Sequence, residues 1–403
     1  MGRLTFISSD GHVTASRADY RPHVAKKFLG EFDVWVKACD GCPEWTNGAP
    51  GLDPDVQWDS EKRLADLEKE GVVGEVLFPN GMPFLRFGDG KFDLRSFSRE
   101  LRRAALETYN RWLVDFCSRA PGRRAGIMQV SFEDVDQAVE DVYWAVEHGL
   151  RGIHIPGLVA GDTFYFDPKL DPIWRACEEL DLPLNQHGGA GMPNYPLGNP
   201  TTFFAAATTL GLEFAFWSGR VVWQLILGGV FERFPKLKLA VTEGNVDWIP
   251  RTLRQMDWHV EKAPEYLNLL NADLSAIRRF SRKPSEYWYS NCFAGGSFLS
   301  REEVGLRHEI GVDNLMFGLD YPHHESTYPH TRDWLRATMG EAGVSEDEVH
   351  KILGLNAARL YGFDLDALRT RVDGVGFEAS EILQRSSTLD PGQPRVWNLS
   401  RPF

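Results

Sequence analysis

The sequence of 403 residues contains only five cysteines, and this scarcity excludes a fold held together by a disulfide framework. An odd, sparse set of thiols is typical of a reducing compartment, so we expect a cytoplasmic protein. No apolar run approaches the ~18 residues that a membrane-spanning helix requires, and no charged-then-apolar segment opens the chain. The sequence therefore predicts neither a membrane span nor a signal peptide.

Positive charge is also scarce. The chain has 44 lysines and arginines against 57 aspartates and glutamates, which gives a net charge of −13. Nucleic acids and anionic membrane surfaces repel such a protein. These two classes of partner are excluded, and we expect a small-molecule substrate instead.

A glycine-rich phosphate loop is missing after the first predicted strand, where the residues are SSDGHV. This argues against an open dinucleotide-binding sheet. Short apolar runs alternate with amphipathic helical stretches, which is typical of parallel βαβ units. Eight runs are predicted as strands: residues 4–7, 72–79, 125–130, 152–155, 183–187, 237–242, 287–293 and 315–319. Eight units in about 360 residues predict a (β/α)₈ TIM barrel.

Three long segments would follow strands one, five and six and lie on one face as lids, at about residues 13–59, 191–216 and 263–285. They are rich in aromatic residues, which more often pack lids or subunits than contact a substrate. They would still enclose a largely apolar pocket suited to an aromatic or polycyclic molecule. We predict one barrel domain, 1–366, and a C-terminal extension, 367–403, that wraps the surface or a partner subunit.

Metal-ligand side chains gather where the predicted strands end, the place where barrel enzymes build their sites. The strand ends carry Asp10, His12, His154, His187, Glu243, Asn291 and Asp320. Any one of them would be unremarkable in a turn or a helix cap. Together they predict a centre for a divalent metal ion, because imidazole and carboxylate suit zinc, manganese or iron. Zinc is our first expectation.

Several further residues are candidates for contacting the substrate. His323 follows Asp320, and His154 and Asn291 lie at strand ends, although His154 would equally be a core histidine. Arg17 and Arg21 of the first lid would pair with a substrate carboxylate, but solvated surface arginines are the simpler interpretation.

With these residues the chain resembles the amidohydrolase superfamily, in the branch that contains aminocarboxymuconate-semialdehyde decarboxylase and the resorcylate decarboxylases. The resemblance runs from about residue 4 to residue 363. It is carried by SSDGHV, GIHIPG, LNQHGG, GGVFERFPKLKLAVTEGNVDWIP, YSNCFAGG and MFGLDYPHHES.

The resemblance implies one divalent metal ion held by Asp10, His12, His187 and Asp320, with Asp320 also deprotonating the water that the metal activates. Two positions depart from the pattern. Asp10 stands where many relatives have histidine or glutamate. Glu243 stands where the decarboxylases place a histidine that handles a proton, and this puts the transfer of decarboxylase chemistry in doubt.

The charge of this centre needs explanation. Asp10, Glu243 and Asp320 bring three negative charges to one doubly charged ion, and buried excess charge is costly. A second metal ion, a protonated carboxyl group or a nearby arginine would resolve the excess. His323 or His324 would supply a further ligand, so two ions are an alternative to the single ion we favour. Glu243 would otherwise orient a ligand histidine.

We expect a metal-dependent hydrolase in which Asp320 takes a proton from water, His187 and Glu243 take part in catalysis, and His323 or His324 helps to hold the oxyanion. One alternative is non-oxidative decarboxylation of an aromatic or unsaturated carboxylic acid. Another is an oxygenase with one or two non-haem irons, which a carboxylate-rich ligand set would suit. A barrel retained only as a scaffold would be expected to lose its ligands. Pairing through helices and the C-terminal arm predicts a homodimer.

Overall fold

The computed structural model describes residues 2–40, 48, 52–85, 97–157, 163–188, 199–270 and 280–384. In these residues every paired strand runs parallel to its neighbour, in the order β1-β3-β4-β5-β6-β7-β8-β9, and β2 also pairs with β3. The strands are β1 Phe6–Ser8, β2 His12–Val13, β3 Val72–Pro79, β4 Arg124–Gln129, β5 Gly152–His154, β6 Leu184–His187, β7 Leu239–Thr242, β8 Cys292–Ser297 and β9 Leu315–Gly318. The last strand returns to the first, since the amide of Ser9 donates to the carbonyl of Phe317 at 3.0 Å. This nearly closed sheet confirms the predicted barrel.

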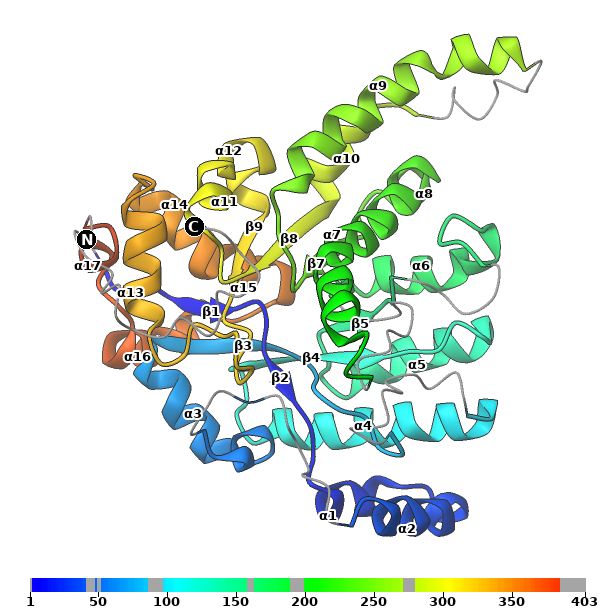
Figure 1. Ribbon diagram of the computed structural model, residues 1–403, viewed down its shortest axis with the longest axis vertical. Helices are drawn as coiled ribbons and strands as arrows, with labels where there is room; N and C mark the ends of the chain where they lie inside the picture. The colour runs from blue at the N-terminus through cyan, green and yellow to red at the C-terminus, as the bar shows by residue number, and fades with distance from the viewer. Residues whose placement is uncertain are drawn as a thin grey trace.

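Helices surround the sheet (Figure 1). They are α1 Arg17–Tyr20, α2 Leu29–Ala38, α3 Ser60–Lys69, α4 Arg99–Ser118, α5 Val135–Glu147, α6 Asp171–Glu179, α7 Phe203–Leu227, α8 Val230–Arg233, α9 Trp248–Leu269, α10 Pro284–Asn291, α11 Arg301–Gly305, α12 Arg307–Ile310, α13 Thr331–Leu335, α14 Glu346–His350, α15 Asn356–Tyr361, α16 Leu365–Val375 and α17 Ala379–Ile382. Side-chain caps start many of them. Ser98 accepts a hydrogen bond from a backbone amide in the first turn of α4, and Asp134 does so for α5. None of the helices within these ranges is both long and apolar enough to cross a membrane.

The apolar strands are buried because helices or other side chains cover both faces of a parallel sheet. One cluster joins Ile7, Ile127 and Met316 of the strands to Leu368 of α16. The backbone amide of Leu4, just before β1, donates to the carbonyl of Phe377 at 2.8 Å. Helix α16 and the residues after it therefore pack at the amino-terminal side of the barrel, away from the carboxyl ends of the strands.

The seventh predicted strand, 287–293, is wrong. Residues Pro284–Asn291 form α10, and β8 spans Cys292–Ser297. Proline suits the first turn of a helix, and the carboxylate of Glu286 accepts the amide of Lys283 at 2.7 Å, so the helix starts where aromatic residues suggested a strand.

The predicted lids are more helical than expected. Residues 203–216 belong to α7, which runs on to residue 227, and α9 continues to residue 269 and projects beyond the barrel in Figure 1. In the first of these segments, α1 and α2 lie together at one edge of the barrel (Figure 1). The predicted boundary at 366 falls inside α16, and 385–403 of the predicted extension lie outside the described residues.

Candidate metal centre

Five of the predicted ligands come together at the carboxyl ends of the strands. Asp10 follows β1, His12 lies in β2, His187 ends β6, Glu243 follows β7 and Asp320 follows β9. Because the strands are parallel, these ends meet at one mouth of the barrel. The structure thus brings these predicted residues together at one mouth of the barrel, and their binding of a metal ion stays a prediction.

Asp10, His12 and His187 form one group whose ligand atoms all lie within 4.8 Å of one another. The Nε2 atom of His187 is 3.2 Å from Oδ1 of Asp10, and Nε2 of His12 is 3.5 Å from the same oxygen. Metal–ligand bonds of about 2.0–2.2 Å place neighbouring ligands roughly 3.0–3.4 Å apart. The spacing of these donors therefore fits a common divalent ion.

A second group contains His12, Glu243, Asp320 and His323, again with ligand atoms within 4.8 Å. Oδ1 of Asp320 lies 3.0 Å from Nε2 of His12 and 2.9 Å from Nδ1 of His323. These atoms and Oδ2 of Asp320 are buried, and none makes a hydrogen bond of ordinary geometry within the described part of the chain. Buried polar atoms normally have a hydrogen-bond partner, so these unsatisfied atoms indicate that an ion binds between them.

The other ring nitrogen of each histidine is held by an acceptor. Nδ1 of His187 donates to the carbonyl of Gly188 at 2.8 Å, and Nδ1 of His12 is 3.4 Å from that of Pro79. The Nε2 atom of His323 lies 2.8 Å from Oδ1 of Asn80. Such contacts fix the tautomer and leave the opposite nitrogen with a lone pair for a metal ion.

Backbone hydrogen bonds join the segment after β1, which carries Asp10 and His12, to the loop after β9, which carries Asp320. The amide of Asp320 donates to the carbonyl of Asp10 at 3.1 Å, and the amide of His12 donates to that of Tyr321 at 2.8 Å. Gly318 is required for this approach, since a Cβ atom there would lie 2.5 Å from Cβ of Asp10. Glu243 and Asp320 both have positive φ values, 51° and 61°. Such backbone conformations outside glycine are concentrated at functional sites.

A buried arginine supports the loops from behind. Arg63 of α3 is completely buried and donates to the carbonyls of His12 at 3.0 Å and Tyr321 at 3.3 Å. Its guanidinium also pairs with Glu75 of β3 at 2.8 Å, and Arg124 reaches the same carboxylate at 3.1 Å. Two arginines and one glutamate leave a net positive charge close to the acidic ligands. A nearby arginine is one of the three features that could compensate the excess negative charge of the candidate ligands.

The carboxyl groups of the site differ in acidity. Burial alone would raise the pKa of Asp320, but the neighbouring His323 and His12 outweigh it and hold the pKa well below its usual range. Burial and the charges of Asp320 and Asp10 raise the pKa of Glu243 well above its usual range. Burial alone would lower the pKa of His323, but the acidic neighbours Asp320, Glu325 and Asp10 together outweigh it and raise the pKa.

His154 belongs to neither ligand group but lies close to both. Its ring centre lies 6.3 Å from that of His187 and 6.2 Å from that of Phe78. Nδ1 lies 2.6 Å from Oε1 of Gln129, while Nε2 is buried without a hydrogen bond in the described structure. Burial, with a smaller effect of His187, lowers the pKa of His154 to about 3, so the ring is neutral. Its free nitrogen is an acceptor.

Other predicted residues lie elsewhere. Asn291 is at the amino-terminal end of β8, where its amide donates to the carbonyls of Pro235 and Leu237, so it is not part of the site. This follows directly from the wrong strand assignment. Arg21 pairs with Asp33 at the surface, with both side chains more than half exposed, and Arg17 lies in the same short helical region.

His324 was predicted as a possible metal ligand and His323 as a substrate contact, but it is His323 that lies among the candidate ligands. His324 is 47% exposed and pairs with Glu325 at 2.9 Å, whereas His323 is buried within the second ligand group. The turn that follows Asp320 decides which ring faces inward.

Sequence reasoning missed three supporting residues. Asn80 directly follows the predicted strand 72–79, so the strand-end rule would have found it. Ser297 ends β8 and donates to Oδ2 of Asp10, but the shifted strand concealed it. The burial of Arg63 could not be predicted from the sequence, because a charged residue on a helix is normally solvated.

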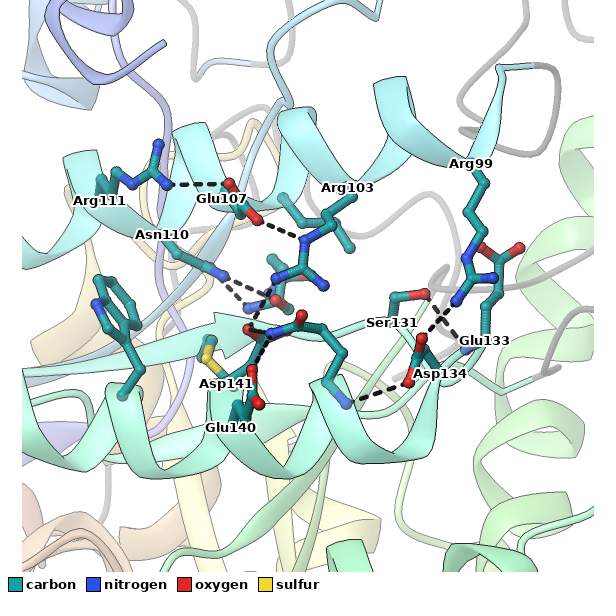
Figure 2. Close-up of a pocket in the computed structure, with 15 residues that line it drawn as sticks. Arg99, Arg103, Glu107, Asn110, Arg111, Ser131, Glu133, Asp134, Glu140 and Asp141 are labelled. Carbon is teal, nitrogen blue, oxygen red and sulfur yellow. Dashed lines mark hydrogen bonds and ion pairs between the residues drawn. The ribbon is translucent and has the colours of Figure 1, made fainter. Parts of the chain in front are cut away.

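A separate hollow lies outside the barrel, between α4 and α5 (Figure 2). Its volume is about 330 Å³, and its charged groups pair with one another along α4 and between α4 and the start of α5. Arg103 contacts Glu107 at 2.6 Å, and Arg99 contacts Asp134 at 2.8 Å. Figure 2 shows these pairs along the rim. The hollow holds none of the metal-ligand groups.

Comparisons with known proteins agree with this architecture. A family model described as Amidohydrolase matches residues 10–363. The 2-amino-3-carboxymuconate-6-semialdehyde decarboxylase of Dictyostelium discoideum is 26% identical over 278 residues, which is 66% of this chain and 67% of that protein.

Solved structures share the fold. The 5-carboxyvanillate decarboxylase LigW from Sphingomonas paucimobilis superposes with a TM-score of 0.62 and 22% identity, over 90% of this chain and 100% of that one. The 5-carboxyvanillate decarboxylase from Novosphingobium aromaticivorans, complexed with manganese and 4-hydroxy-3-methoxy-5-nitrobenzoic acid, has a TM-score of 0.63 and 18% identity, over 89% and 96%. The 2,6-dihydroxybenzoate decarboxylase from Rhizobium has a TM-score of 0.58 and 20% identity, over 90% and 99%.

Proposed function

The chain belongs to the amidohydrolase family, and from this premise we propose that it catalyses metal-dependent, non-oxidative decarboxylation of an aromatic or unsaturated carboxylic acid. The observation that carries the proposal is the buried set of Asp10, His12, His187 and Asp320 at the carboxyl ends of the strands, in a chain similar to several decarboxylases. This favours the reaction that the sequence analysis ranked second, ahead of the hydrolase ranked first.

The residues fit a divalent ion. Buried imidazole nitrogens and carboxylate oxygens converge, and those of His12, Asp320 and His323 have no hydrogen-bond partner within the described residues; these donor types suit zinc, manganese or iron. When bound, the ion would hold a substrate carboxylate and an adjacent oxygen and would withdraw charge from them. Zinc remains a proposal. The bound manganese in a structurally similar decarboxylase makes manganese the metal to test beside it.

His154 would orient the substrate. Its unpartnered Nε2 atom accepts a hydrogen bond from a hydroxyl group next to the reacting carbon, while Gln129 holds the ring in place. Phe78 lies beside both His154 and His187 and offers an apolar surface for an aromatic ring. Such a wall excludes water from one side of the substrate.

The reaction balances without an oxidant. The bond between the ring carbon and the carboxylate breaks, carbon dioxide leaves, and the electron pair stays on the ring carbon. That carbon then takes a proton from water, so one proton is consumed for each carbon dioxide released. Asp320, whose pKa is held low by His323 and His12 in spite of burial, stays ionised and keeps its oxygens available for the metal.

Hydrolysis through a metal-activated water is the second candidate. Both carboxylate oxygens of Asp320 lack hydrogen bonds to the described residues, so this group is placed to accept a proton from such a water. Glu243 also replaces the histidine that the resemblance to decarboxylases leads one to expect. A homodimer in the cytoplasm remains our prediction.

The test is a panel of hydroxylated benzoates and unsaturated acids, supplied to protein loaded with manganese or zinc, with release of carbon dioxide as the readout. Asp320→Asn is expected to lower turnover at least 10³-fold, as loss of a transition-state interaction of about 4 kcal/mol would. Asp313→Asn is the matched control, since Asp313 is exposed at the amino-terminal side of β9. Turnover by Asp320→Asn close to that of the control would refute the assigned role.

A further inference from the structure

We propose that His154 is a specificity-determining residue, which selects substrates that carry a hydrogen-bond donor, a hydroxyl or an amino group, beside the reacting carbon. Gln129 and Asn110 are the positioning residues that give His154 this preference. The inference rests on the proposed function and deepens it, because it states which substituent the site accepts. An ether or an ionised phenolate at this position is rejected, since its oxygen has no proton to donate.

The tautomer of His154 follows from the side chain of Gln129. The two residues lie opposite each other in the pairing of β4 with β5, and Oε1 of Gln129 lies 2.6 Å from Nδ1 of His154. The orientation of the amide group is fixed, because its Nε2 atom donates to the carbonyl of Ile127 at 3.3 Å. Oε1 only accepts, so Nδ1 of His154 carries the proton. Burial lowers the pKa of His154 to about 3, so the ring is neutral and Nε2 is a bare acceptor.

Asn110 of α4 holds the backbone of Gln129. Its Nδ2 atom donates to the carbonyl of Gln129 at 2.8 Å, and its Oδ1 atom accepts the amide of Gln129 at 2.9 Å. Both residues are buried and line the hollow between α4 and α5, where Figure 2 labels Asn110. The direction of the lone pair on Nε2 of His154 is therefore set before any substrate binds.

His154 does not have the contacts of an ordinary core histidine, in which both ring nitrogens would be satisfied. Its Nε2 atom has no hydrogen-bond partner within the described residues, and His154 belongs to neither group of candidate metal ligands. The ring centre lies 6.3 Å from that of His187, so the acceptor is next to the metal centre. A donor on the substrate is the partner that this arrangement requires.

The surroundings of His154 make an unmet hydrogen bond costly. The ring centre of Phe78 lies 6.2 Å from that of His154 and 4.4 Å from that of His187. Apolar surroundings strengthen a hydrogen bond that forms and penalise a buried polar atom that has none. A methoxy oxygen would bring a second lone pair against Nε2, so we expect loss of the donor to weaken binding at least about tenfold.

The experiment measures binding by calorimetry to the full-length protein loaded with Mn²⁺. The probes are a benzoate with hydroxyl groups at both positions beside the carboxylate, its monomethyl ether, and the analogue in which one hydroxyl is replaced by an amino group. Each probe keeps one hydroxyl for the metal ion. We expect the dihydroxy and amino acids to bind at least about tenfold more tightly than the ether, and His154→Phe to bring this ratio close to one.

Two results would overturn the proposed selection by His154. One is equal binding of the three acids to the wild-type protein, or no binding of any of them. The other is an unchanged ratio in folded His154→Phe, since the ether would then be rejected by its size. Thermal unfolding verifies that each variant is folded.

Nitrogen NMR of isotopically labelled histidine tests the positioning residues without a substrate. In metal-free protein the signal of His154, assigned by its loss in His154→Phe, should show a bare Nε2 and a protonated Nδ1. In Gln129→Met the proton should move in part to Nε2. Gln137→Met is the matched control, because Gln137 lines the same hollow but its side chain donates to Glu140 and Asp141. A protonated Nε2 in the wild type, or an unchanged tautomer in Gln129→Met, would contradict the positioning role.

Release of carbon dioxide from the same acids separates this inference from the proposed function. Release together with equal binding of the three acids refutes only the role of His154. Selective binding without release refutes only the proposed function.

Discussion

Replacement of Arg63 by methionine tests whether a buried ion pair positions the metal ligands. The substitution keeps an unbranched side chain of similar reach but removes the charge and every donor. Arg63 is fully buried, pairs with Glu75 at 2.8 Å and donates to the carbonyls of His12 and Tyr321. After the change, Glu75 keeps only Arg124, and two backbone carbonyls beside metal ligands lose their donor.

The expected cost follows from these contacts. Removal of one partner from a buried ion pair destabilises a protein by about 3–5 kcal/mol, because the remaining charge stays buried. We therefore expect the free energy of unfolding of the metal-free protein to fall by about 3–5 kcal/mol. His12 and the loop that carries Asp320 would also be held less firmly, and loss of such support typically weakens metal binding 10- to 100-fold.

Urea unfolding at neutral pH measures the first effect, and titration of the metal-free protein with Mn²⁺ measures the second. Lys62→Met is the control, because the neighbouring Lys62 forms only exposed ion pairs with Asp53 and Asp55. It should leave both quantities unchanged. Arg63→Lys should recover part of the stability but less of the metal affinity, since lysine lacks the planar fork. A loss below about 1 kcal/mol with normal metal affinity would refute the positioning role.

Two further predictions concern the same framework. Gly318→Ala should lower the free energy of unfolding by about 1–3 kcal/mol and reduce bound metal, because the new Cβ would lie 2.5 Å from Cβ of Asp10; an unchanged melting temperature and metal content would contradict this. Burial would raise the pKa of Glu75, but Arg63 and Arg124 together outweigh it and hold the pKa below its ordinary value of 4.5. The pair therefore stabilises the metal-free protein fully above about pH 4.5 and loses that contribution as the pH falls through the folded pKa. Urea unfolding of wild type and Glu75→Gln should converge as the pH is lowered below 4.5, and a constant difference would contradict the reasoning.

The barrel was predictable because its strands are short apolar runs that alternate with amphipathic helices, and this pattern survives tertiary packing. The exception is α10, where the aromatic residues Tyr287 and Trp288 suggested a strand. There Pro284 and Glu286, which start a helix, outweigh the preference of aromatic residues for β-strands.

The convergence of the candidate ligands was predictable for the same reason, since a residue that ends a parallel strand is carried to the mouth of the barrel. What the sequence could not give is the direction of a side chain beyond the strand. His323 and His324 are adjacent, and only the turn after Asp320 separates a buried ring from an exposed one. Arg63 was hidden because its role depends on contacts with β2 and the loop after β9, both far away in the sequence.

Parallel measurement of carbon dioxide and dissolved oxygen during turnover tests the proposed function most directly. Protein loaded with Mn²⁺ or Zn²⁺ is supplied with carboxyl-labelled aromatic acids. The account predicts one labelled carbon dioxide for each product molecule, at the same rate with and without oxygen. Oxygen consumed in step with product, or product formed by hydrolysis without labelled carbon dioxide, would contradict it.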